Sequence, residues 1–281
     1  MADEETSVSA AAAAVVTDKI TGDATKSSPL TVVVTGASSG IGLELVTQLA
    51  ARGDKVFATV RKLQSSQTGK DLISAIPGDV TIIKGVDVAS DTVGDVLAAS
   101  PLKGVTVDVL IHNAGTYNAT RSVDPSKVFD EQSLENITMD RMRMTFEVNT
   151  LGPLRIQKAL QSQMRSPGGK IAVISTGMGS ISDNTSGGKY AYRISKAGVN
   201  MLVKSFACDM KKAGIAAVAI APGFVATEFG PGMATMKKWG AKPVSQAGKG
   251  IITALDALSM ENTGEFLMVA SATGELKKFA W

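Results

Sequence analysis

From residue 30 onward, short runs of β-branched and apolar residues alternate with longer amphipathic stretches. This alternation is typical of parallel strands joined by helical crossovers. The short runs are apolar at nearly every position, which suits strands that are covered by helices on both faces. The sequence therefore predicts an α/β fold, a doubly wound and mostly parallel sheet of seven strands with helices on both faces. The expected strands are 31–36, 55–60, 80–88, 107–115, 169–176, 215–223 and 264–270.

The amphipathic stretches between these runs have the apolar spacing of α-helices. One of them contains Pro153. Because proline has no N–H and crowds the preceding turn, we expect a kink near Asn149 and Thr150. The expected helices are 41–53, a polar helix after the strand 55–60, one through DTVGDVLAAS at 91–100, 139–164, 190–214 and 246–257.

The first 29 residues differ from the rest of the chain. They are rich in Ala, Ser and Thr, and begin with acidic residues such as Asp3 and Glu4 rather than with arginines. This composition argues against a secretory signal and an organelle transit peptide. We interpret residues 1–29 as a disordered tail. No linker or fixed-period repeat divides residues 30–281, so a single domain is expected there.

Composition excludes several classes of function. Of the 281 residues, 44% are hydrophobic and 20% charged, a balance typical of globular domains. The net charge of +3 is small and dispersed, which predicts no nucleic-acid partner, and no apolar run is long enough to cross a membrane. Cys208 and His112 are the only residues of their types, so neither a disulfide nor a multi-histidine zinc site can be built. A cytoplasmic location fits this cysteine usage.

The stretch T-G-A-S-S-G-I-G, residues 35–42, connects an expected strand to an expected helix. Gly36 lets the chain turn out of the strand, Gly40 lets backbone approach a phosphate, and Gly42 lets the helix pack closely on the sheet. The free N–H groups at the start of the helix suit a pyrophosphate. The spacing G-x-x-x-G-x-G differs from the commoner G-x-G-x-x-G, but its context predicts a dinucleotide site on a Rossmann-type fold.

The end of the second expected strand indicates which dinucleotide binds. An acidic residue at this place usually accepts hydrogen bonds from the adenosine ribose, but here the strand ends Thr59-Val60-Arg61-Lys62. A guanidinium can instead hold a 2′-phosphate through its planar fork of donors. Arg61 therefore favours NADP(H) over NAD(H), and the alternative is a solvated basic loop.

Tyr192 and Lys196 stand four residues apart in YAYRISK, so both side chains share one helix face. A phenol with a pKa of about 10 is a poor proton donor or acceptor near neutral pH. A neighbouring ammonium favours the phenolate and lowers that pKa. The pair therefore predicts a general acid/base and its electrostatic partner.

Four motifs in order and at the expected spacing give the chain from residue 30 to 281 a resemblance to the short-chain dehydrogenase/reductase family. TGASSGIG matches the family's TGxxxGxG, HNAG at 112–115 its NNAG, YRISK at 192–196 its YxxxK, and APG at 221–223 its PG turn. The chain is most similar to the carbonyl-reductase branch that includes sniffer and C-factor proteins.

The resemblance implies roles for individual residues. Tyr192 exchanges the substrate proton, Lys196 holds the nicotinamide ribose and lowers the tyrosine pKa, and Asn149 anchors a water in the proton relay. Asp87 and Val88 are expected at the adenine. The expected cofactor contacts are Gly36, Ser38, Ser39, Gly40, Ile41, Gly42, Arg61, Asp87, Val88, Asn113, Ala114, Gly115, Tyr192, Lys196, Pro222, Gly223, Val225 and Thr227.

The chain departs from the family pattern at the residue that holds the substrate carbonyl. The family commonly has the second serine of a Ser-Ser pair there, whereas this chain has Ser175-Thr176. A threonine hydroxyl can make the same hydrogen bond. We therefore take Thr176 as the candidate, with Ser175 and Ser180 as alternatives. His112 replaces the first asparagine of NNAG, and we attach no function to it.

The resemblance implies an NADP(H)-dependent oxidoreductase that transfers hydride between the nicotinamide and a small carbonyl or alcohol substrate. The alternative is a catalytically idle NADP(H)-binding sensor or interaction protein. Within the enzyme class, a hydroxysteroid, quinone or acyl-thioester substrate stays open. The segment 224–243 is expected to form a substrate lid, with Met233, Met236 and Trp239 lining an apolar pocket. A homodimer or homotetramer formed through 139–164 and 190–214 is the implied assembly.

Overall fold

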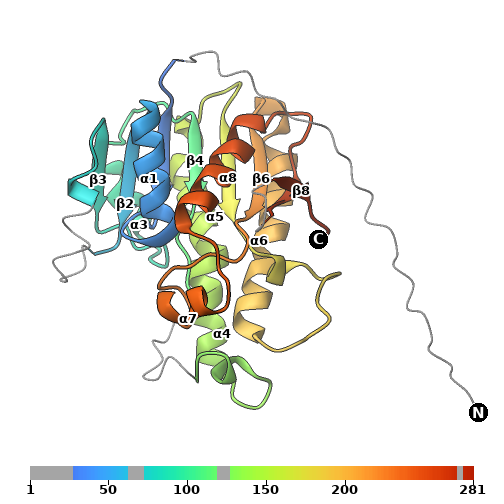
Figure 1. Cartoon of the computed structure of the whole chain (residues 1–281). Helices are drawn as coiled ribbons and strands as arrows, with labels where there is room; N and C mark the ends of the chain where they lie inside the picture. The colour runs from blue at the N-terminus through green and yellow to red at the C-terminus, as the bar shows by residue number, and fades with distance from the viewer. Residues whose placement is uncertain (1–27, 63–72, 119–126, 271–274) are drawn as a thin grey trace, which may run out of the picture.

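The computed structural model describes residues 28–62, 73–118, 127–270 and 275–281 (Figure 1). The expected tail over 1–29 lies almost entirely outside the described residues. Eight strands form one sheet in the order β3-β2-β1-β4-β5-β6-β7-β8. Every pairing is parallel except that between β7 and β8. The strands are β1 (Thr31–Thr35), β2 (Lys55–Val60), β3 (Val80–Lys84), β4 (Val109–His112), β5 (Lys170–Ile174), β6 (Ala216–Ala221), β7 (Glu265–Val269) and β8 (Leu276–Lys278).

Helices cover both faces of this sheet because its central strands are apolar on both faces. In β1, Val33 belongs to one core, whereas Val32 and Val34 belong to the other. The first core is closed by α3 (Val93–Ala98), α5 (Gly152–Leu160) and α6 (Tyr190–Asp209). The second is closed by α1 (Gly40–Arg52) and α8 (Val244–Ala257), which lie in front of the sheet in Figure 1. This confirms the predicted doubly wound α/β fold.

The winding direction changes between β1 and β4. Residues after β1 lead to β2 and β3 on one side, whereas β4 leads to β5, β6 and β7 on the other. In open parallel sheets, ligands bind in the crevice at the carboxyl ends of the strands where the order reverses. The glycine turn follows β1 and HNAG follows β4, so the topology brings both motifs to this crevice.

The strand count differs from the prediction of seven. The additional strand, β8, has three residues, two of them exposed lysines, so its sequence carries no strand pattern. It pairs with β7 and leads to Trp281, whose ring stacks on Phe266 with 5.4 Å between centroids. The Trp281 carbonyl oxygen accepts hydrogen bonds from the backbone N–H and hydroxyl of Ser182, at 3.1 and 2.9 Å. This contact joins the end of the sheet to the loop that follows β5.

The helix expected over 139–164 is divided. It consists of α4 (Met139–Phe146), a π-helical turn (Glu147–Leu151) and α5. The irregular turn is where the kink was predicted. Pro153 stands in the first turn of α5, where its missing N–H is tolerated.

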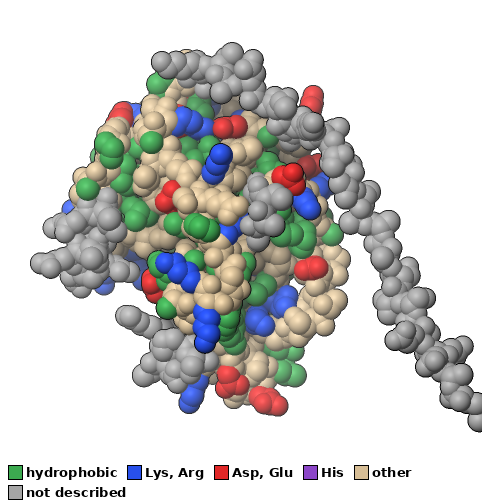
Figure 2. All heavy atoms as spheres, in the orientation of Figure 1, with side chains coloured by type: hydrophobic (Ala, Val, Ile, Leu, Met, Phe, Trp, Pro, Cys, Tyr) green, Lys and Arg blue, Asp and Glu red, His purple; other side chains and the backbone are tan. Residues whose placement is uncertain are grey.

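In the described part of the chain, no helix is long and apolar enough to cross a membrane. On the face seen in Figure 2, Lys and Arg side chains lie among acidic and apolar ones rather than in one continuous patch.

Candidate active site

The glycine turn leaves room for a ligand phosphate at the start of α1. Gly36 and Gly40 have positive φ angles of 67° and 56°, which favour glycine. A Cβ on Gly36 would lie 2.7 Å from the Cα of Ala114, and one on Gly42 would overlap the Gly36 carbonyl oxygen. Ser39 is the N-cap of α1 but its side chain makes no capping bond. The first N–H groups of α1 therefore face a cradle that fits a dinucleotide pyrophosphate.

The HNAG loop, residues 112–115, is hydrogen-bonded to the glycine turn. The backbone N–H groups of Asn113 and Ala114 donate to the Thr35 hydroxyl at 3.0 and 3.1 Å. The Asn113 side chain donates to the carbonyl oxygens of Thr35 and Gly36 at 3.0 and 3.1 Å. The two motifs, remote in sequence, thus form one rigid wall of the crevice.

The residues expected at the adenosine end lie at the ends of β2 and β3. Arg61 directly follows β2 and is exposed. The Asp87 carboxylate accepts from the Ala89 N–H at 3.0 Å, which holds the turn after β3. The Val88 side chain belongs to the core and packs against Gly152, so only its backbone is free to face a cofactor.

The segment after β6 reaches the same cradle. A Cβ on Gly40 would lie 3.5 Å from the Thr227 methyl group, so this threonine stands beside the glycine turn. Val225 is buried and forms an isolated bridge with Lys242, which anchors the segment. Pro222 and Gly223 connect β6 to it. Cofactor candidates from both halves of the chain thus meet at one edge of the sheet.

Tyr192 is buried in the first turn of α6, and its phenol lies within hydrogen-bonding reach of the Thr176 hydroxyl. Burial raises the pKa of Tyr192, and the interaction with Thr176 opposes this rise. The two serine alternatives have other partners. The Ser175 hydroxyl donates to Asn200 Oδ1 at 2.6 Å, and the Ser180 hydroxyl contacts that of Ser182 at 3.2 Å. The structure therefore brings Thr176 to the phenol.

Lys196 lies on the same face of α6 as Tyr192. Its Nζ donates to the Ile174 carbonyl oxygen at 2.7 Å and lies 6.0 Å from the centre of the Tyr192 ring. A Cβ on Gly115 would lie 3.7 Å from this nitrogen, so Lys196 reaches the HNAG loop. Burial lowers the pKa of Lys196 to about 8. The prediction that this ammonium lowers the pKa of Tyr192 was wrong: burial raises that pKa, and Thr176, not Lys196, is the group that opposes the rise.

Asn149 lies in the π-helical turn, and both the oxygen and the nitrogen of its side chain have hydrogen-bond partners. Its Oδ1 accepts from the Thr116 N–H at 2.8 Å, and its Nδ2 donates to the Thr116 carbonyl and the Ser195 hydroxyl, both at 2.9 Å. Its backbone carbonyl is different. The residue four positions on is Pro153, which has no N–H to donate, so this oxygen lacks the ordinary α-helical partner.

Sequence reasoning missed the aromatic residues around Tyr192. The rings of Tyr117 and Phe229 lie 4.8 and 5.8 Å from that of Tyr192, and Phe129 lies 5.6 Å from Tyr117. Of the expected lid residues, Trp239 joins this group through Phe129, at 5.8 Å. Met233 is exposed. The missed residues follow strands or lie in loops without periodicity, so only their aromatic type could have indicated them.

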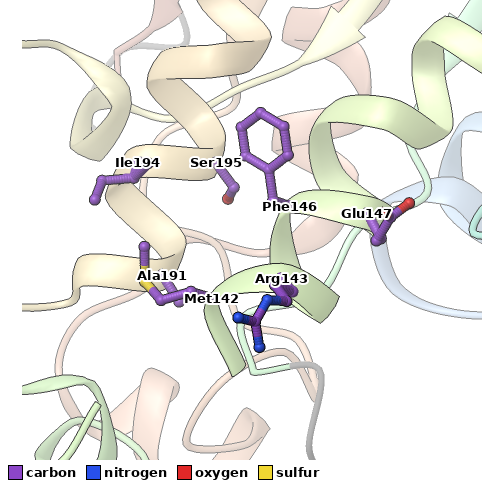
Figure 3. A pocket seen from close by; sticks show the side chains of 7 residues that line it. All are labelled: Met142, Arg143, Phe146, Glu147, Ala191, Ile194 and Ser195. Atoms are coloured by element: carbon purple, nitrogen blue, oxygen red, sulfur yellow. The ribbon is translucent and has the colours of Figure 1, made fainter. Parts of the chain in front are cut away.

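A cavity of about 280 Å³ lies between α4 and α6 (Figure 3). Its lining comes from α4, the π-helical turn and α6: Met142, Arg143, Phe146, Glu147, Ala191, Ile194 and Ser195. At about 100° per residue, the α6 members lie on a different face of the helix from Tyr192 and Lys196. The cavity is therefore separate from the crevice.

The fold and the glycine turn define a dinucleotide-binding α/β protein. The chain belongs to the short-chain dehydrogenase/reductase family, since the family model described as short chain dehydrogenase matches residues 30–238. The predicted family is thus confirmed.

Individual relatives agree with this assignment. The chain is 35% identical over 237 residues to 1-hydroxy-2-glutathionyl-2-methyl-3-butene dehydrogenase of Rhodococcus sp. (strain AD45), covering 84% of this chain and 95% of the relative. Among solved structures, it is similar to NADPH-bound carbonyl reductase from chicken fatty liver, with 30% identity, a TM-score of 0.74, and coverage of 90% and 99%. The carbonyl reductase Sniffer of Caenorhabditis elegans matches with 26% identity, a TM-score of 0.69, and coverage of 91% and 100%. The Sniffer match agrees with the branch named from the motifs.

Proposed function

We propose that the chain is an NADP(H)-dependent oxidoreductase that interconverts a carbonyl and an alcohol, with Tyr192 as the general acid in reduction. The observation that carries this proposal is the meeting of buried Tyr192 and Lys196 with half-buried Thr176 beside the HNAG loop. A proton donor, a hydroxyl for the substrate oxygen and a cation are the groups that carbonyl reduction needs from a protein.

The crevice fits a dinucleotide, and the glycine turn, Asn113 to Gly115 and Thr227 would hold it. Arg61 is exposed at the place where the acid that binds the ribose usually stands. Its guanidinium can bind a 2′-phosphate, which supports NADP(H) as the cofactor. The NADPH-bound carbonyl reductase supports the same choice. When bound, the nicotinamide supplies or accepts the hydride.

The side chains then handle the proton. Thr176 donates a hydrogen bond to the substrate oxygen, which positions the carbonyl, and Tyr192 gives its phenolic proton to the same oxygen. The Lys196 ammonium stabilises the phenolate that this transfer leaves. The Asn149 backbone carbonyl oxygen, which has no α-helical donor at Pro153, would hold a water that returns a proton through Lys196. This order reverses for alcohol oxidation.

The proposal is tested by NADPH consumption against a panel of aldehydes, ketones and diketones. We expect turnover by the wild type and a loss of at least about 100-fold in kcat in Tyr192→Phe, since general acid catalysis contributes that much. Tight NADPH binding without turnover on any substrate, and no effect of Tyr192→Phe, would favour the sensor alternative.

Cofactor choice is tested separately by titrating NADP+ and NAD+ into the wild type and Arg61→Ala. We expect a loss of roughly 10-fold in NADP+ affinity and little change for NAD+, because one charge-assisted contact is removed. Lys62→Ala is the matched control, because Lys62 is the exposed cation next in sequence. Tighter binding of NAD+ than of NADP+ by the wild type would refute the choice.

We also propose a homodimer formed through α4 and α6. Four apolar side chains of these helices are exposed, and one of them, Ile194, lines the cavity of Figure 3. The other three are Met139, Met144 and Met201. Sedimentation equilibrium of the wild type and Met201→Asp tests this proposal. A wild-type monomer at micromolar concentration would contradict it.

A further inference from the structure

Thr176 is the first residue of the loop that leaves the sheet after β5. The residue before it still belongs to the sheet, because the Ser175 N–H donates to the Ile220 carbonyl oxygen of β6 at 2.8 Å. Thr176 then caps a short 3-10 turn, Gly177–Gly179. We call residues 176–182 the threonine loop. The place of the Thr176 hydroxyl therefore depends on what packs against this loop.

The middle of the threonine loop lies against α6. A Cβ on Gly179 would lie 2.9 Å from the Lys196 carbonyl carbon and oxygen, so the backbones of loop and helix are in close contact. The Asn200 side chain donates to the Gly179 carbonyl oxygen at 3.1 Å. These two contacts hold the loop at Gly179.

The β8 segment, residues 276–281, contacts both ends of the threonine loop. A Cβ on Gly177 would lie 3.6 Å from two carbons of the Phe279 ring, so this ring stands beside the residue that follows Thr176. At the other end, Ser182 donates its backbone N–H and its hydroxyl to the Trp281 carbonyl oxygen. The loop is thus held by α6 in its middle and by the β8 segment at its ends.

Phe279 is itself fixed by the sheet. Its N–H donates to the Phe266 carbonyl oxygen at 2.7 Å, and the two rings pack edge-on with 5.3 Å between centroids. Phe266 is a buried residue of β7. Closely packed interiors transmit small displacements from one side chain to the next. The position of the Phe279 ring therefore affects that of Gly177.

The 3-10 turn connects Gly177 to the Thr176 hydroxyl. This hydroxyl accepts from the Met178 N–H at 3.3 Å, and the Gly179 N–H donates to the Thr176 carbonyl oxygen at 2.9 Å. A shift of the turn therefore moves the hydroxyl relative to the Tyr192 phenol. A reacting group that is misplaced by about 1 Å can lower a rate on the order of 100-fold.

We propose that Phe279 is a positioning residue for carbonyl reduction: its ring packs beside Gly177 and holds the threonine loop where the Thr176 hydroxyl reaches the Tyr192 phenol. Phe279 acts through Thr176, which distinguishes it from a residue that only fills the core. This inference rests on the proposed function, in which Thr176 holds the substrate oxygen.

The test is a double-mutant cycle of Phe279→Ala and Thr176→Ala, with kcat/KM measured on the carbonyl compound that the wild type reduces fastest. We expect Phe279→Ala alone to lower kcat/KM roughly 10-fold. In the Thr176→Ala background, the same substitution should change kcat/KM less than about 2-fold, because no hydroxyl remains to be misplaced. An equal loss in both backgrounds, or no loss in either, would overturn the inference.

Two further variants separate positioning from stability. Phe206→Leu removes an aromatic ring from the same core, where this ring lies beside that of His112. It should lower the Tm but change kcat/KM less than about 2-fold. A loss of kcat/KM as large as that in Phe279→Ala would overturn the inference. If Phe279→Ala does not fold, Phe279→Leu takes its place in the cycle, because leucine keeps the core filled, and the same outcomes decide.

Hydrogen exchange measures the loop without turnover. In the protein without ligand, the amides of residues 177–182 should exchange at least about 5-fold faster in Phe279→Ala than in the wild type, whereas those of α1 should be unchanged. Unchanged exchange in the threonine loop would overturn the inference. If the wild type reduces no carbonyl compound, the proposed function fails, while the exchange rates still decide whether Phe279 holds the loop.

Discussion

The Thr176 hydroxyl lies within hydrogen-bonding reach of the Tyr192 phenol, whereas the hydroxyl of Ser175 is directed to Asn200 in the core. This difference separates the two candidates for the residue that holds the substrate. We expect Thr176→Ala to lower kcat/KM by about 10- to 100-fold, because one transition-state hydrogen bond is lost, and to lower the Tm slightly, because the hydroxyl also accepts from the Met178 N–H at 3.3 Å. Steady-state kinetics and thermal unfolding of the same preparation measure both quantities.

Two variants serve as controls for this prediction. Thr176→Ser keeps the hydroxyl and should retain most activity. Ser175→Ala should instead lower the stability by about 1–3 kcal/mol, since it leaves buried Asn200 Oδ1 without its donor, and should change kcat/KM less than Thr176→Ala. The opposite ranking of the two alanine variants would transfer the substrate-holding role to Ser175.

Lys196 predicts a pH dependence for cofactor use. Because burial lowers its pKa to about 8, the ammonium is present below pH 8 and is lost as the pH rises through that value. We expect kcat/KM for NADPH, measured at saturating carbonyl, to fall above a pKa of about 8, since this parameter reports the free protein. The Lys196→Arg variant should have a lower kcat/KM, but that value should not fall above pH 8, because a guanidinium stays charged. An identical fall in the variant would show that another group titrates.

His112, the only histidine, predicts a pH dependence of stability. It is fully buried beside Gln157, and burial lowers its pKa to about 4 from 6.5. Between these two values the unfolded chain binds the proton and the folded protein does not, so stability falls as the pH drops from 6.5 to 4. At about 1.4 kcal/mol per pH unit, the loss amounts to about 3 kcal/mol. Urea unfolding at both pH values measures it.

His112→Asn places the family's usual residue at this position and should remove most of that loss. The active-site groups are not altered, so kcat at pH 7 should stay within about 2-fold of the wild-type value. An unchanged slope of stability against pH would assign the acid sensitivity to other groups.

Gly42 and Gly94 form a matched pair for the cofactor cradle, because both are helical glycines without a positive φ angle. A Cβ on Gly42 would overlap Asn113 Nδ2 and the Gly36 carbonyl oxygen, whereas one on Gly94 would lie 3.7 Å from the nearest atom, on Ala159. We expect Gly42→Ala to cost about 1–3 kcal/mol of stability and most NADPH affinity. Gly94→Ala should preserve both. Thermal unfolding and NADPH fluorescence titration check the pair, and equal behaviour would contradict the close packing.

Those parts of the site that come directly after strands could be predicted from the sequence. TGASSGIG and HNAG each follow an apolar run, and parallel strands deliver such loops to one edge, where Asn113 bonds Thr35 and Gly36. The spacing of Tyr192 and Lys196 placed both on one helix face. These features depend on local periodicity and on topology, and both can be read from one chain.

Other parts depend on tertiary contacts that leave no local pattern. Tyr117 and Phe229 become neighbours only when the segments after β4 and β6 fold over α6. β8 is too short and too charged to be recognised, and it is held by its pairing with β7. The choice of Thr176 over Ser175 likewise depends on which side of the strand end faces Asn200.

The bond between Ser182 and the Trp281 carbonyl has a consequence for protein synthesis. Its two residues are separated by 99 positions, so the loop after β5 cannot be fastened until Trp281 has left the ribosome. A nascent chain can therefore join the glycine turn to the HNAG loop, which needs residues only up to 114, before the loop that carries Thr176 is secured. Ribosome-bound chains that are stalled with Trp281 inside the exit tunnel and with Trp281 outside it should differ in how well that loop is protected from proteases.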